Sequence, residues 1–205
     1  MINMNDKTKI ILLLIIFFLI IVLGFINIGL ISSNNSQSEF NRTVSQASSI
    51  ENISDMEFAK YYNKSITTSD ESIAVFKNKT NYINEEIIIL QSFDGKSDND
   101  TLKDYVNLEI KRLTSEKEAF DYLVRDMENY NRYKNKSITK DYALGVSNQN
   151  TMELERISNN TFGIKSECEY YLNMHPDIKE VLVNLNVDDD FYANNIQYSN
   201  ITRII

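Results

Sequence analysis

The side chains that most often carry out chemistry are rare in this sequence. Cys168 is the only cysteine and His175 the only histidine. A nucleophilic cysteine needs a base and an exposed thiol, but the alternation of residues around Cys168 points its side chain inward beside Ile164 and Tyr170. A histidine metal site needs further ligands, and His175 stands in a turn signal before Pro176. We therefore predict a packed core cysteine and a surface histidine.

Acidic residues gather in two places, neither of which has the spacing of a metal site. Residues 94–100 read DGKSDND, but a calcium loop needs glycine at its sixth position and a bidentate glutamate at its twelfth. Counting from Asp94 places Asn99 and Tyr105 there. Residues 188–190 are three aspartates at the predicted start of a helix, where acids favour the helix dipole. We predict no catalytic, cofactor-binding or metal-binding residue, and expect that the protein is not an enzyme.

Asparagine supplies the clearest modification signal. The chain holds nine Asn-x-Ser/Thr sequons, more than its composition gives by chance. The glycosylation candidates are Asn34, Asn41, Asn52, Asn63, Asn78, Asn99, Asn135, Asn159 and Asn200. This excess favours a glycosylated surface protein, and the alternative is a coincidence of composition in an archaeal or AT-rich prokaryotic genome.

The stretch over residues 10–31 would decide the location of such a protein. It reads IILLLIIFFLIIVLGFINIGLI without a charge, and at about 1.5 Å per residue a helix of this length crosses a hydrocarbon core roughly 30 Å thick. Lys7 and Lys9 precede it, so the positive-inside rule places the N-terminus in the cytoplasm. We predict a single-pass plasma-membrane protein with an extracytoplasmic C-terminal domain. A cleaved secretory signal is the alternative.

The predicted organisation has four parts. Residues 1–9 form a cytoplasmic lead, residues 10–31 a transmembrane signal-anchor helix, residues 32–53 a polar stalk, and residues 54–205 an extracytoplasmic domain. The formal net charge of −8 argues against a nucleic-acid partner. With one cysteine and no intrachain disulfide, the domain must be held by an apolar core.

The domain is expected to begin with a short helix, from a capping box of Ser54 and Glu57, and to continue with a hairpin and a longer helix. Residues 72–77 alternate, and residues 86–93 contain the run Ile87–Leu90, as in a strand covered on both faces. The turn would lie over residues 78–84. Residues 101–132 carry apolar side chains every three or four residues, which predicts a helix. A capping box at Ser115 allows two helices that meet near residue 114.

The last third favours β-structure. Strands are predicted over residues 138–146, 152–154, 162–172 and 181–187, with a final helix after residues 188–190. The fold class is therefore α+β, in which an N-terminal transmembrane helix precedes an antiparallel sheet. That sheet, a hairpin plus a four-strand meander, would pack against one or two helices.

This order of elements resembles the PsbP/Mog1-like sandwich of small exported domains. The resemblance is carried by SIAVFKN, EEIIILQSF, LKDYVNLEIKRL, TFGIKSECEYYL, KEVLVNL and FYANNIQYSNITRII, which fall within residues 70–205. The composition and sequons also resemble those of Asn-rich, single-anchor surface proteins of methanogenic archaea. Both resemblances imply an accessory or binding role and supply no catalytic residues.

Three functional hypotheses follow. The first is a membrane-anchored extracytoplasmic binding or envelope-associated module, which contacts lipid through residues 10–31 and an envelope protein or polymer through its domain. The second is a surface hydrolase that uses two carboxylates, about 5–9.5 Å apart in a glycosidase. The third is a pilin-like subunit that assembles through its apolar N-terminal helix. No cofactor is expected for the first.

Overall fold

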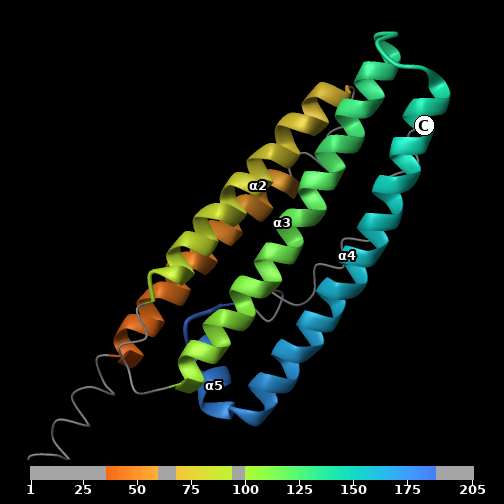
Figure 1. Cartoon of the computed structure of the whole chain (residues 1–205). Helices are drawn as coiled ribbons and strands as arrows, with labels where there is room; N and C mark the ends of the chain where they lie inside the picture. The colour runs from red at the N-terminus through yellow and green to blue at the C-terminus, as the bar shows by residue number, and fades with distance from the viewer. Residues whose placement is uncertain (1–35, 60–67, 94–99, 188–205) are drawn as a thin grey trace, which may run out of the picture.

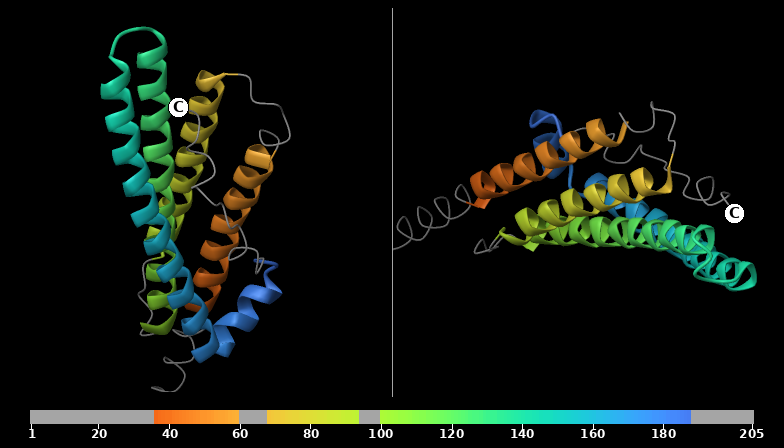
Figure 2. Two further views of the ribbon diagram at one scale, coloured as in Figure 1. Left: turned by 90° about the vertical axis from the view of Figure 1, so that its right-hand side faces the viewer. Right: turned by 90° about the horizontal axis from the view of Figure 1, so that it is seen from above.

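The structure is a computed structural model that describes residues 36–59, 68–93 and 100–187. Over these residues the chain forms five helices and no β-strand (Figure 1). The helices are residues 36–59, α2 (Ser69–Gln91), α3 (Asp100–Lys134), α4 (Lys140–Met174) and α5 (Pro176–Asn184). The first four run alternately up and down, and α5 lies across the base of the bundle (Figures 1 and 2).

The predicted α+β fold is wrong, and α2 shows why. This helix contains both strands of the predicted hairpin and its turn. Its buried positions recur every three or four residues, at Ser72, Phe76, Lys79, Ile83, Glu86 and Leu90. Half of these positions are polar, so the helical period is hidden from a search for apolar residues. What remains visible is the local run of isoleucines, which mimics a strand.

The same mistake explains the predicted four-strand meander. Residues 138–172 lie almost entirely in α4, and residues 181–187 contain the end of α5. The buried row of α4 is Ala143, Ser147, Asn150, Leu154, Ile157, Thr161, Ile164, Cys168 and Leu172. Its steps of three and four residues are helical, but serine, asparagine and threonine interrupt the apolar pattern. Pro176 begins α5, a position where its fixed φ suits the first helical turn.

The predicted helix over residues 101–132 is confirmed as α3, which is one unbroken helix. It lies between α2 and α4 and packs against both (Figure 1). Helix 36–59 packs across α2 and α3 through two aromatic rings. The Phe40 ring lies 5.9 Å from that of Tyr105, and the Phe58 ring 5.7 Å from that of Phe120. Most of the predicted polar stalk is therefore part of the bundle.

The membrane prediction also needs correction. No helix among residues 36–59, 68–93 and 100–187 is both long enough and apolar enough to cross a bilayer. The two helices of 35 residues have the length but carry charged side chains along it. A single-pass membrane protein with a signal-anchor is therefore not supported. The predicted span at residues 10–31, its lead at residues 1–9 and the helix after residue 190 lie outside the described residues.

Candidate functional site

A group of charged side chains lies in the core where helix 36–59, α2 and α3 meet. We call it the buried charged layer, and it consists of Glu51, Asp55, Lys79, Glu86, Glu109, Arg112 and Glu116. Four of its members are at least 96% buried. Charged side chains are almost never buried this deeply unless they are paired. The layer is therefore the most unusual chemical feature of the bundle.

Arg112 is the centre of this layer. Its side chain is 2% exposed, and its guanidinium donates to Glu109 Oε2 at 2.8 Å, Glu116 Oε2 at 3.2 Å and Glu51 Oε1 at 3.4 Å. Burial alone would lower the pKa of Arg112, but the charges of these carboxylates outweigh it and raise the pKa well above its ordinary value. Arg112 thus stays charged and ties α3 to helix 36–59.

Lys79 makes the second connection between helices. It is 4% exposed, lies on α2 and pairs through Nζ with Asp55 of helix 36–59. Burial lowers the pKa of Lys79, whereas the charges of Glu116 and Asp55 raise it, and the net shift is upward. Across the boundary with α4, burial and the charge of Arg112 lower the pKa of Lys165. Lys79 on α2 and Arg112 on α3 therefore keep their positive charges, whereas Lys165 on α4, beside the layer, loses its proton more easily.

Three glutamates of the layer are not fully paired. Glu86 Oε1, Glu51 Oε2 and Glu109 Oε1 are buried without a hydrogen-bond partner. Burial, followed by the negative charge of Glu51, raises the pKa of Glu86 to about 9. Burial raises the pKa of Glu51 to about 7, although Arg112 opposes the shift. Near neutral pH, Glu86 therefore holds a proton and Glu51 holds one part of the time, which reduces the excess of negative charge.

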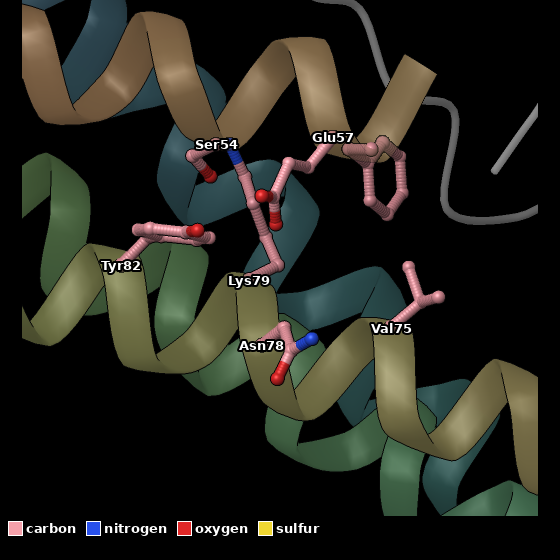
Figure 3. Close-up of a pocket in the computed structure, with 7 residues that line it drawn as sticks. Ser54, Glu57, Val75, Asn78, Lys79 and Tyr82 are labelled. Atoms are coloured by element: carbon pink, nitrogen blue, oxygen red, sulfur yellow. The ribbon is translucent and has the colours of Figure 1, made fainter. Parts of the chain in front are cut away.

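The layer is a network of ion pairs that is mostly buried between the helices. Within the described helices, no group of three or more His, Cys, Asp or Glu side chains has the arrangement of a metal site. A small hollow opens beside Lys79, between helix 36–59 and α2 (Figure 3). Its volume of about 60 Å³ suits a few water molecules, whereas ligand pockets typically measure roughly 300–1,000 Å³. Its one carboxylate is Glu57.

Of the predicted site residues within the described ranges, Cys168 borders this layer at Glu109, whereas His175 lies at the junction of α4 and α5. Cys168 is buried as predicted, and burial raises the pKa of its thiol to about 12, with a further contribution from Glu109. His175 is partly buried, and its ring stacks at 4.4 Å on that of Tyr171. Sequence analysis missed the layer. Its signal was a row of polar and apolar residues at helical spacing in α2, namely Ser72, Phe76, Lys79, Ile83, Glu86 and Leu90.

The sequons divide by local structure. Asn52, Asn78, Asn135 and Asn159 are exposed, and Asn41 is partly buried. Asn34, Asn63, Asn99 and Asn200 lie outside the described residues. In three helical sequons the hydroxyl residue is buried, at Thr43, Ser54 and Thr161. Asn135 differs, because it lies in the turn between α3 and α4 with Ser137 exposed. The use of any sequon stays a prediction.

A second surface feature lies on α4, at the edge of the bundle (Figure 1). Away from α3, this helix exposes Met152 by 70%, Phe162 by 70%, Tyr170 by 68% and Met174 by 60%. Met152, Tyr170 and Met174 fall opposite the buried row of α4 in the helical period, and Phe162 lies at the flank of that side. We call this side, from Asn148 to Met174, the outer face of α4.

Comparison with known proteins identifies no relative of this chain. No family model, curated protein or solved structure matches the chain. The function must therefore be argued from the two features described above, the buried charged layer and the outer face of α4.

Proposed function

We propose that the protein is a non-catalytic helical module that binds another protein through the outer face of α4. One observation carries this proposal: the outer face exposes four large apolar side chains along one helix, each by 60% or more. Aromatic residues and methionine are the side chains enriched at protein interfaces. Their exposure to water is unfavourable unless another surface covers them.

The distribution of charge favours binding over catalysis. The carboxylates that lie close together are in the core, where they hold helices to one another. The hollow beside Lys79 contains one carboxylate, Glu57, whereas glycoside hydrolysis uses two that flank the substrate. The hydrolase hypothesis therefore has less support than binding.

Site-specific photocrosslinking in the native host tests the proposal. A photoreactive phenylalanine analogue would replace Phe162, which is 70% exposed on α4. We expect a discrete adduct with another polypeptide. The matched control places the same analogue at Ile88, which is 64% exposed on α2 and should give no such adduct. Equal crosslinking from both positions, or none from Phe162, would contradict the proposal.

A further inference from the structure

We infer that the outer face of α4 receives a basic amphipathic helix of a partner protein, with a large apolar side chain of that helix seated over Gly163. This inference rests on the proposed function and names the chemistry of the partner. It is carried by the arrangement of apolar, small and acidic residues along α4.

The residues of the outer face form rows that repeat every seven positions. In one row, Phe162 stands between Glu155 and Glu169, seven residues from each. A central row contains Met152, and its next positions, Asn159 and Ser166, carry shorter side chains. Residues seven apart lie nearly above one another on a helix, since seven residues make almost two turns. The outer face therefore carries separate large apolar side chains among short polar ones, with acids along one side.

Gly163 leaves open space on this surface at a helix position where a side chain of a second helix could pack. In helix pairs, a side chain of one helix enters a hole formed by residues i, i+3, i+4 and i+7 of the other. Asn159, Phe162, Gly163 and Ser166 have that spacing. A Cβ atom built on Gly163 meets no atom within 4 Å, so packing within this chain does not require glycine there. The missing side chain leaves room for the partner, next to the Phe162 ring.

Charge identifies the occupant. Glu155 and Glu169 are exposed, and Lys165, four residues before Glu169, is half-buried. Arg156, next to Glu155 in the sequence, is already paired with Glu153 at 2.7 Å and with Glu118 at 3.2 Å. A partner with lysine or arginine beside its apolar stripe would pair with the free acids. Such pairs contribute mainly to specificity and to the rate of association.

The same charges disfavour a second copy of this chain. An antiparallel pair of α4 helices centred on Phe162 places Glu155 of one copy against Glu169 of the other, because both are seven residues from the centre. A parallel pair places each acid against its own counterpart. Like charges brought together at an interface oppose association. The outer face is thus suited to a different chain of opposite charge.

A pair of designed peptides tests the inference with the full-length protein. Both are 21-residue amphipathic helices with the same leucine stripe, flanked by lysine in one and by glutamate in the other. We expect fluorescence anisotropy to show that the lysine peptide binds about tenfold more tightly than the glutamate peptide. Glu155→Lys with Glu169→Lys should remove or reverse this preference, and Gly163→Gln should weaken binding of the lysine peptide.

The control variant changes charge equally at another place. Asp104→Lys with Glu180→Lys alters two exposed acids on α3 and α5 and should leave the preference for the lysine peptide intact. An equal loss of preference in both double variants would overturn the inference, because it would show attraction by net charge alone. A dimer of the chain that Phe162→Ser dissociates, or a glycan on Asn159 in the native protein, would overturn it as well.

The two proposals fail differently. If Phe162 crosslinks a native partner but the lysine peptide shows no preference for the outer face, the proposed function stands and the inferred chemistry of the partner is wrong. If neither experiment gives its expected result, the outer face is not a binding surface.

Discussion

The buried charged layer and the outer face of α4 reverse the usual distribution of side chains. In the first, a guanidinium and several carboxylates are removed from water, and in the second, large apolar groups are exposed to it. The first arrangement is largely satisfied within the chain, because Arg112 bonds carboxylates on two helices. The apolar side chains of the outer face are not covered in this way by the described residues. We propose that the layer serves the fold, whereas the outer face serves binding to another molecule.

The largest effect should come from breaking the layer at Arg112. Arg112→Met leaves Glu51, Glu109 and Glu116 without their shared cation in the core. Removal of one partner from a buried ion pair costs about 3–5 kcal/mol, so we expect the free energy of unfolding in urea to fall by that amount. The control, Lys111→Met, removes the exposed pair between Lys111 and Glu167 and should cost about 0–1 kcal/mol.

If Arg112→Met does not fold, Arg112→Lys provides the measurement. It keeps the charge but loses the planar donors that reach three carboxylates, so its stability should lie between that of Arg112→Met and that of the wild type. A wild-type urea midpoint for Arg112→Met would mean that the layer contributes little to the fold.

A smaller effect, with a distinctive pH dependence, is expected at Glu86. The folded chain keeps the proton of this side chain up to its pKa of about 9, whereas the ordinary pKa of a glutamate, as in the unfolded chain, is 4.5. Unfolding therefore releases a proton within that window, and stability is lost as pH rises through it. The loss from this group approaches about 1.4 kcal/mol per pH unit.

Glu86→Gln should remove that slope, because glutamine has no proton to release. We expect the stabilities of this variant and the wild type to converge at acidic pH and to diverge toward pH 9, with the variant more stable. Glu85→Gln, at the exposed neighbouring position, should keep the wild-type slope. Parallel pH profiles for wild type and Glu86→Gln would contradict the raised pKa.

The smallest effect lies on the outer face. Gly163→Ala adds a Cβ that meets no atom within 4 Å and favours the helical backbone, so it should raise the free energy of unfolding by about 0.5–1 kcal/mol. Gly145→Ala is a matched second site, with equally open space. Thermal unfolding of both variants measures the gain. A loss of stability at Gly163 would mean that this face is already occupied within the chain.

The sequence predicts the bundle only where its core is apolar. In α3, buried positions such as Leu102, Leu113 and Phe120 recur at helical spacing, and the predicted helix is correct. In α2, Lys79 and Glu86 take core positions. Because each needs a charged neighbour from another helix or a bound proton, nothing local to the sequence marks them as inward. The helical period of α2 was therefore hidden, whereas α3, which carries Glu109 and Arg112, keeps enough buried apolar positions to be predicted.

The outer face was not predicted from the sequence, for a related reason. Its apolar residues, among them Phe162 and Tyr170, were assigned to the core face of a predicted strand. In a strand, Phe162, Ile164 and Cys168 share one side, but in a helix Phe162 points away from the other two. Choosing the period of a strand thus placed exposed residues of α4 in a predicted core, and only the three-dimensional arrangement shows their exposure.

The single thiol, Cys168, can report when the helices around it separate. Reagents that modify cysteine attack the thiolate, and Cys168 is both covered and held in its protonated form while α3 and α4 are together. Its labelling rate therefore follows the moments when those two helices separate. The rate at which α3 and α4 separate can therefore be measured in the wild-type chain, without an engineered probe.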